Sequence, residues 1–156
     1  MTAAPIEIRP YAPGDHDGLL SLIGRTLAEF GFASNIGGVE ADLAALEERY
    51  GGARGGMWIA DRAGTVVGCV AIRPKDGATC ELKRLYVNPE ARGHGLGQRL
   101  YARAEEFARA AGYARIWLDS SRRFTQARRL YERNGFVLLE ELDNDWEDNV
   151  YEKRLV

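Results

Sequence analysis

Three glycines and an arginine lie within six residues of one another, in the stretch RGHGLG: Arg92, Gly93, Gly95 and Gly97. The stretch follows a predicted strand, ELKRLYV, and precedes a predicted helix. Main-chain N–H groups in such a turn, and in the first turn of the helix, lack internal partners and point toward an anion. Glycines let a phosphate approach the backbone closely, and the arginine adds a cation. The sequence therefore predicts a binding site for a phosphate or pyrophosphate.

The glycine spacing excludes one familiar phosphate loop and disfavours another. A P-loop needs Gly-Lys followed by Ser or Thr, a triplet that the sequence lacks. A G-x-G-x-x-G fingerprint that starts at Gly93 or Gly95 would need its third glycine at Gln98 or Leu100, so both starts fail. Asp119 follows at the end of the next predicted strand, about where a ribose-binding acid would lie. A nucleotide-dependent oxidoreductase therefore remains an alternative.

A second motif accompanies the glycine turn. Arg92, Gly95 and Gly97 fill the pattern R-x-x-G-x-G, and the block ARRLYERNGF follows about thirty residues later. With these two blocks the sequence resembles the GCN5-related N-acetyltransferases (GNAT), most closely over 80–112 and 127–136. The resemblance implies a fold whose fourth and fifth strands splay apart to admit the pantetheine arm of acetyl-CoA. It also implies transfer of the acetyl group to a primary amine by direct attack in a ternary complex.

The resemblance assigns cofactor contacts to two segments. The residues expected to align the pantetheine arm, and to polarise the thioester carbonyl with a main-chain N–H, are Leu85, Tyr86 and Val87. The residues expected around the pyrophosphate are Arg92, Gly93, His94, Gly95, Leu96 and Gly97. The family often has an asparagine seven residues before its tyrosine. Here that position holds Phe124, so Thr125 or Ser121 is expected to make this cofactor contact instead.

Two side chains are candidates for proton transfer. Glu81 lies in the middle of a predicted strand, and we expect it to take a proton from the amine, directly or through a water. The other interpretation of Glu81 is a surface carboxylate paired with Lys83. Tyr131 shares a helix face with Ala127 and Leu130, so packing alone would account for it. The resemblance makes Tyr131 the acid that protonates the thiolate of CoA.

Charged side chains near the second block suggest further contacts. One or two of five arginines are expected to meet the 3′-phosphate of CoA, the alternative being a solvated helix face. These arginines are Arg122, Arg123, Arg128, Arg129 and Arg133. In the family the acceptor site is built by segments that correspond here to 31–40 and 142–149. The second segment, LDNDWEDN, places four carboxylates around Trp146, and together they would attract a cationic amine. The alternative interpretation of this loop is a solvated acidic turn.

Apolar periodicity predicts the elements that position these residues. Strands are expected at 6–9, 57–61, 65–73, 79–87, 115–119, 136–142 and 149–155, and helices at 16–30, with Asp15 as N-cap, 40–50, 96–111 and 125–134. This order predicts an α/β (mixed α+β) fold in one domain, 1–156. Its central mixed, twisted sheet of about seven strands is flanked on both faces by about four helices.

Composition and charge limit the kinds of molecule that the chain is expected to bind. The chain has 156 residues and a net charge of −2, which predicts no nucleic-acid or membrane partner. The N-terminus MTAAPIEIRP lacks the features of a signal peptide, and no apolar run is long enough to span a membrane, so we expect a cytoplasmic protein. Cys69 would lie opposite Lys83 if the hairpin paired Arg73 with Thr79, so no disulfide to Cys80 is expected. The cysteines and histidines have no metal-ligand spacing, and no metal is expected.

The sequence therefore predicts an acetyl-CoA-dependent N-acetyltransferase. Its acceptor would be an amine of a small molecule or peptide. A small amine, an amino acid, an antibiotic, a polyamine, and a protein lysine or N-terminus all stay open. A homodimer is compatible with the sequence, which does not specify the oligomeric state. A non-catalytic CoA-binding or sensing module on the same fold is the main alternative.

Overall fold

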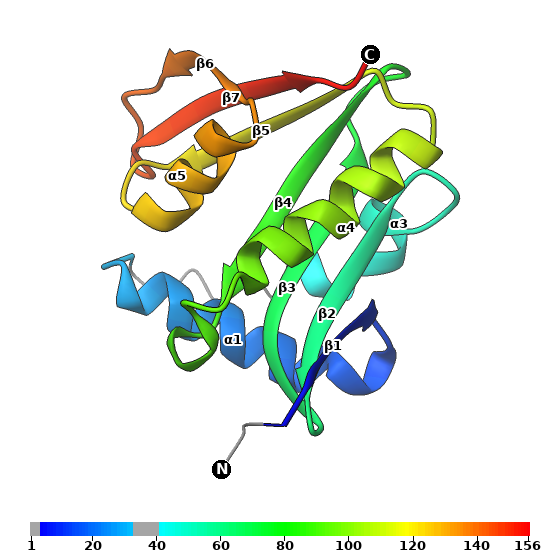
Figure 1. Ribbon diagram of the computed structural model, residues 1–156, viewed down its shortest axis with the longest axis vertical. Helices are drawn as coiled ribbons and strands as arrows, with labels where there is room; N and C mark the ends of the chain where they lie inside the picture. Colours follow the sequence, from blue (N-terminus) through cyan, green and yellow to red (C-terminus); the bar gives the residue numbers. More distant parts are fainter. Residues whose placement is uncertain (1–3, 33–40) are drawn as a thin grey trace.

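A seven-stranded twisted sheet forms the centre of the computed structural model, which describes residues 4–32 and 41–156 (Figure 1). The strands lie in the order β1-β2-β3-β4-β5-β7-β6. They are β1 (Ile6–Pro10), β2 (Gly56–Arg62), β3 (Thr65–Pro74), β4 (Thr79–Val87), β5 (Arg115–Ser121), β6 (Val137–Glu141) and β7 (Asp148–Arg154). Neighbouring strands are antiparallel except β4 and β5, which are parallel. The predicted mixed sheet is confirmed.

Helices cover both faces of the sheet (Figure 1). They are α1 (His16–Glu29), α3 (Leu46–Tyr50), α4 (Leu96–Ala110) and α5 (Thr125–Arg133), with 3-10 turns η1 (Pro13–Asp15) and η2 (Pro89–Ala91). Side chains alternate along β2, so Trp58 and Ala60 pack in the core beneath α4 and α5. Met57 and Ile59 pack in the opposite core, beneath α1 and α3. Two apolar cores therefore hold the sheet between helical layers, as predicted.

The parallel strands β4 and β5 stay together over a short length only. Their paired residues are Thr79 with Arg115, Cys80 with Ile116, and Glu81 with Trp117. Beyond Glu81 the two strands diverge, and Figure 1 shows α5 in front of β5 on the diverging side. The expected splay between the fourth and fifth strands is confirmed. Among the residues that the structure describes, it leaves one edge of β4 without a strand partner from residue 82 to 87.

The register of the β3–β4 hairpin differs from the expected one. Arg73 pairs with Glu81 instead of Thr79, because β3 extends to Pro74 and the turn occupies 75–78. Cys69 pairs with Tyr86 instead of Lys83, because this hairpin register moves the pairing by two residues and a bulge opposite Val70 adds one more residue in β4. The prediction for the cysteines holds nevertheless. Both are free and buried, and burial raises the pKa of each thiol to about 12.

Two helix predictions need correction. Asp15 occupies the N-cap position of α1, but its side chain makes no capping bond. Its carboxylate instead accepts two hydrogen bonds of 2.8 Å from the Arg9 guanidinium and one of 2.8 Å from the main-chain N–H of Ala12. The helix predicted at 40–50 is interrupted at Ala45, so residues 41–44 form one helical turn and α3 follows. Residue 40 lies outside the described part.

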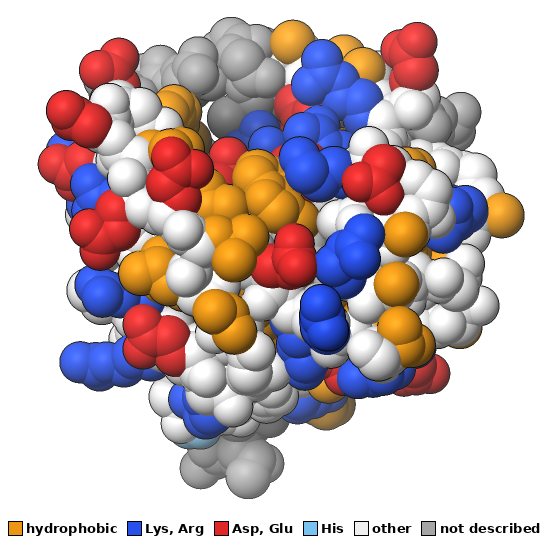
Figure 2. Space-filling view, turned by 90° about the horizontal axis from the view of Figure 1, so that it is seen from above, with side chains coloured by type: hydrophobic (Ala, Val, Ile, Leu, Met, Phe, Trp, Pro, Cys, Tyr) orange, Lys and Arg blue, Asp and Glu red, His pale blue; other side chains and the backbone are white. Residues whose placement is uncertain are grey.

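The outer strand β6 leaves an apolar edge exposed. Val137, Leu138 and Leu139 are all exposed on it. Figure 2 looks onto the end of the molecule where β6 and β7 lie, and shows hydrophobic side chains gathered among acidic and basic ones. Within 4–32 and 41–156, no helix is long and apolar enough to cross a bilayer, and no three His, Cys, Asp or Glu side chains are grouped to hold a metal ion.

Candidate active site

A cavity of about 420 Å³ opens where β4 leaves β5. Its walls come from the end of β4, the glycine turn, the first turn of α4, α5 and the residue before it, and the C-terminal end of α1. The lining residues are Thr26, Phe30, Leu85, Tyr86, Val87, Arg92, Gly93, Gly95, Leu96, Gly97, Gln98, Phe124, Gln126, Ala127, Arg129, Leu130 and Arg133. Eight of the ten expected cofactor residues are among them, and His94 and Thr125 are not.

The glycine turn presents main-chain donors to this cavity. Gly95 caps α4 in the left-handed conformation, with φ of 75°. The N–H of Arg99 is the first along α4 to reach an earlier carbonyl, that of Gly95, at 3.0 Å. The N–H groups of residues 93–98 have no acceptor within the described chain. These donors and the positive end of the helix dipole favour an anion at this end of the cavity.

Gly97 lies close to α5 on the cavity wall. A Cβ added to Gly97 would lie 3.4 Å from Cδ1 of Leu130, which belongs to α5. A larger side chain at this position would push α4 away from α5 or fill the cavity. The glycine therefore keeps the turn and α5 close enough to share one ligand.

Arg92 is held more firmly than the sequence suggests. Its Nε donates to the carbonyl oxygen of Val87 at 2.9 Å. Its two terminal nitrogens donate to the carboxylate of Glu29, at 2.6 and 2.9 Å. Arg92 therefore joins the turn to β4 and α1, and the carboxylate of Glu29 offsets part of its charge at the anion site.

The five arginines near α5 separate into two groups. Arg129 and Arg133 line the cavity. The other three are engaged elsewhere: Arg122 donates to main-chain carbonyls of Leu142 and Asp148, Arg123 pairs with Glu147, and Arg128 pairs with Glu132. The positions of Arg129 and Arg133 fit the expectation that one or two of the five reach a phosphate.

Tyr131 follows Leu130 on α5 but, unlike Leu130, it is not among the residues that line the cavity. It is buried, and its ring packs against Phe136 and Tyr151 at centroid distances of 5.6 and 5.9 Å. Burial, and then charge coupling to Tyr86, raise the pKa of Tyr131 above its ordinary value, with Ser120 opposing the shift. The phenol therefore stays protonated at neutral pH, as a proton donor requires.

Glu81 lies at the closed end of the splay, where β4 and β5 are still paired. It is buried, and its carboxylate accepts hydrogen bonds of 3.1–3.3 Å from Arg73 across the strand pair. The ammonium of Lys83 lies 3.5 Å away, so the pairing considered as the alternative is present. Glu81 does not line the cavity, and the structure does not bring it together with Tyr131.

The comparisons with known proteins agree with this geometry. The model of the acetyltransferase (GNAT) family matches residues 27–136. The chain belongs to the acetyltransferase (GNAT) family. An uncharacterized N-acetyltransferase of Schizosaccharomyces pombe is 37% identical over 92% of this chain and 89% of its own length. The resemblance seen in the sequence is confirmed, and the enzyme class is an N-acetyltransferase with acetyl-CoA as donor.

Solved structures show the same GNAT fold. A crystal structure of an acetyltransferase from Streptococcus agalactiae has a TM-score of 0.86 and 30% identity, and the match covers 96% of this chain and 98% of that one. The PaiA N-acetyltransferase of Thermoplasma acidophilum, in complex with coenzyme A, has a TM-score of 0.75 and 20% identity, over 96% of this chain and 99% of its own. At that identity the second likeness concerns the fold alone.

The acceptor side of this GNAT domain is only partly described. Most of the predicted segment 31–40 lies outside the described residues. In the 142–149 loop, Glu147 pairs with Arg123 at 2.9 Å, and Trp146 packs against Phe32 with centroids 4.8 Å apart. The ring of Trp146 is therefore partly covered. Burial raises the pKa of Asp148, and the nearby Asp119 adds to the shift.

An aromatic cluster replaces the asparagine that many GNAT members carry at the position of Phe124. The ring of Phe124 contacts Phe30, Phe32 and Tyr86 at centroid distances of 4.9, 5.6 and 6.0 Å. These contacts join α1, β4 and the start of α5 beside the cavity. A side chain that packs this way donates no hydrogen bond to a cofactor. Neither expected substitute lines the cavity, since Ser121 is buried and Thr125 is exposed outside it.

Sequence reasoning missed two features of the site. Thr26 and Phe30 line the cavity from α1, and their spacing of four on one helix was an available signal. The bulge in β4 was also missed. Its signal is the break in alternation at Lys83 and Arg84, two consecutive charged residues inside a strand.

Proposed function

We propose that this protein transfers the acetyl group of acetyl-CoA to a primary amine by direct attack in a ternary complex. The observation that supports it most is the single cavity that joins the glycine turn to the open edge of β4. An anion site alone fits many nucleotides. An anion site continuous with an unpaired strand edge fits a ligand with a pyrophosphate and an extended, amide-bearing arm.

The residues present fit the parts of coenzyme A. The unpaired N–H groups of 93–98 would hold the pyrophosphate, as they have no acceptor in the described chain. The open edge of β4 at 85–87 would pair with the amides of the pantetheine arm, as a strand edge pairs with an extended peptide. Arg129 and Arg133 would meet the 3′-phosphate. When bound, acetyl-CoA supplies an acyl group activated as a thioester.

Tyr131 is proposed as the proton donor to the departing thiolate. The supporting observations are its burial on α5, the helix whose Leu130 lines the cavity, and its charge coupling to Tyr86 of β4. Its raised pKa keeps the proton available at neutral pH. A main-chain N–H of 85–87 would stabilise the negative charge that develops on the acyl oxygen, which contributes about 3 kcal/mol in comparable enzymes.

Glu81 is proposed as the group that receives the proton of the amine, through a water. Its carboxylate is held by Arg73 and Lys83 and lies outside the cavity, which leaves a bridging water as the route for the proton. The acceptor is proposed to be a primary amine of a small molecule or a peptide.

Two measurements test this function. Thermal shift with acetyl-CoA, CoA and NAD is expected to show stabilisation by the first two only, since a ligand at about a hundred times its Kd adds about 2.7 kcal/mol. Release of free CoA thiol with a panel of amines is expected to identify a turnover substrate. Binding of CoA without thiol release from any amine would instead support a non-catalytic CoA-binding module. Stabilisation by NAD alone would contradict both.

A further inference from the structure

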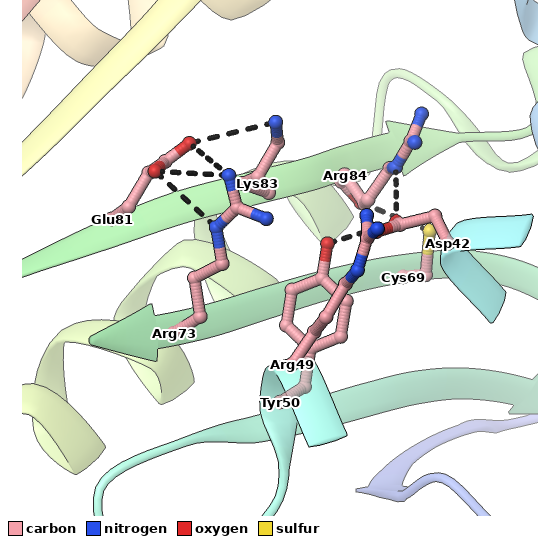
Figure 3. Close-up of polar contacts among 8 residues, drawn as sticks. All are labelled: Asp42, Arg49, Tyr50, Cys69, Arg73, Glu81, Lys83 and Arg84. Atoms are coloured by element: carbon pink, nitrogen blue, oxygen red, sulfur yellow. Dashed lines mark hydrogen bonds and ion pairs between the residues drawn. The ribbon is translucent and has the colours of Figure 1, made fainter. Parts of the chain in front are cut away.

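Two polar clusters lie side by side on the face of β3 and β4 that packs toward α1 and α3 (Figure 3). The first is centred on Glu81, which the proposed function uses. The second is centred on Asp42, whose carboxylate accepts hydrogen bonds from three side chains. These are Arg84 Nε at 3.2 Å, Tyr50 Oη at 2.9 Å and Arg49 Nη1 at 2.9 Å. The second cluster has no role in the chemistry described so far.

The central pair of this second cluster, Asp42 and Arg84, lies largely out of solvent, whereas the Arg49 side chain is 48% exposed. The side chain of Asp42 is 5% exposed and that of Arg84 is 16% exposed. Burial alone would raise the pKa of Asp42, but the charge of Arg84 and the hydrogen bonds from Tyr50 and Arg49 outweigh it and hold this pKa below its usual value. The pair is therefore ionised at neutral pH. The cost of removing two charges from water offsets much of the attraction in a buried ion pair, so stability alone does not account for this one.

Arg84 is also the residue at which the backbone of β4 is unusual. Its φ is 58°, in the left-handed region that side chains with a Cβ seldom adopt. The strand gains one residue here relative to β3. Across the bulge, the thiol of Cys69 donates to the carbonyl oxygen of Arg84 at 3.0 Å. Side-chain contacts from two other segments thus hold both the guanidinium and the carbonyl of this one residue.

The bulge decides how the next residues face the cavity. Because side chains alternate along a strand, one residue more or less turns every following side chain to the other face. With the bulge, Leu85 and Val87 pack toward α4 while Tyr86 packs toward α1. All three line the cavity, and their main chain is the edge proposed to hold the pantetheine arm.

We propose that Arg84 is a positioning residue: its ion pair with Asp42 holds the β4 bulge in the shape that presents the main chain of 85–87 to the thioester. This inference rests on the proposed function. The ion pair also ties the helical turn 41–44, which precedes α3, to the edge of the strand. We call this ion pair the Arg84–Asp42 clamp. The glycine turn that would hold the pyrophosphate is a separate part of the cavity wall, so loss of the clamp is expected to lower turnover more than cofactor affinity.

Two variants separate the effect of the ion pair from the effect of the residues of β4. Asp42→Asn removes the charge of the pair and leaves every residue of β4 unchanged. Arg84→Gly allows the left-handed φ without strain but removes the guanidinium. Each is expected to lower kcat about tenfold with the Kd of acetyl-CoA within about threefold of wild type. The double variant is expected to lose less than the product of the two single losses, because both single variants remove the ion pair between Asp42 and Arg84.

Hydrogen exchange gives a readout that does not depend on catalysis. In Asp42→Asn, the amides of 85–87 are expected to exchange at least about tenfold faster than in wild type, while the amides of α4 are unchanged. Ala63→Gly is the matched control for Arg84→Gly. Like Arg84, Ala63 has a left-handed φ, of 51°, but it lies in the exposed turn between β2 and β3. This variant is expected to leave both kcat and the exchange of 85–87 as in wild type.

The outcomes separate this inference from the proposed function. Unchanged kcat and unchanged exchange in both variants would overturn the clamp, and so would a loss of acetyl-CoA binding as large as the loss of turnover. If wild-type protein releases no thiol with any amine, the proposed function fails. The exchange of 85–87 then decides alone whether Arg84 and Asp42 hold the bulge.

Discussion

Arg92 and Glu29 are joined by two hydrogen bonds, of 2.6 and 2.9 Å, although they are 63 positions apart in the chain. The pair fastens the glycine turn to the end of α1 and places a carboxylate next to the proposed pyrophosphate site. The carboxylate of Glu29 therefore both positions the Arg92 guanidinium and offsets part of its charge.

Arg92→Ala is expected to weaken CoA binding about tenfold, because one charge-assisted contact is worth about 1.4 kcal/mol or more. Glu29→Gln is the matched variant. It leaves Arg92 bonded to the carbonyl of Val87 and removes the competing charge, so CoA affinity is expected to stay or to rise at low salt. Titration calorimetry at two salt concentrations measures both. Equal weakening in the two variants would show that the pair positions the turn and that the charge of Arg92 contributes little.

Tyr131→Phe is expected to lower kcat about 10²-fold or more, the range for loss of a general acid. Because the pKa of Tyr131 is raised, wild-type kcat should show no loss from ionisation of this phenol below about pH 10. Thiol release between pH 6 and 10 measures both effects. Tyr113→Phe is the control, since Tyr113 is another buried tyrosine, its hydroxyl donates to the carbonyl of Arg54 at 2.6 Å, and it lies between α4 and β5, not on α5. Unchanged kcat in Tyr131→Phe would remove the acid role.

Glu81→Gln is expected to lower kcat about 10²-fold if the carboxylate receives the proton through a water. The same change also leaves Arg73 and Lys83 without their anionic partner, at a cost of about 1 kcal/mol in the free energy of unfolding. Steady-state kinetics and urea denaturation on the same preparation separate the two. A loss of stability with kcat unchanged would assign Glu81 to the ion-pair cluster alone.

Arg129→Ala and Arg133→Ala are expected to reduce the preference for CoA over 3′-dephospho-CoA, each by about fivefold to tenfold, because a phosphate contact is lost. Competition binding with the two ligands measures the preference. Arg128→Ala, on the same helix but paired with Glu132 and outside the cavity wall, should keep it. A preference retained in both cavity variants would place the 3′-phosphate elsewhere.

Asp42 is expected to make stability depend on pH in acid. Its pKa is lowered in the folded protein, so the carboxylate stabilises the fold above its unfolded value of about 4 and loses this effect as pH falls through the folded value. Asp42→Asn should therefore be less stable than wild type at pH 7, with the difference shrinking below about pH 4. Thermal unfolding at several pH values measures the difference. A difference that stays constant with pH would mean that the charge of Asp42 does not stabilise the fold.

The sequence by itself determined the glycine turn, its anion site, and the order of strands and helices. These follow from local properties: left-handed glycines, unpaired N–H groups at a helix start, and apolar periodicity. It also placed Tyr131 on a helix beside Ala127 and Leu130. Such features depend on neighbours within a few residues, so they can be predicted from the amino-acid sequence.

Only the tertiary structure decided which partner each charged residue meets. Glu29 meets Arg92, Asp42 meets Arg84 across 42 positions, and Glu81 meets Arg73 through the hairpin register that the turn at 75–78 sets. For each charged side chain, the sequence offers many oppositely charged residues that would form ion pairs of similar strength. The packing of α1, α3 and β4 selects among them, because a buried charge must be paired and packing brings only a few partners within reach.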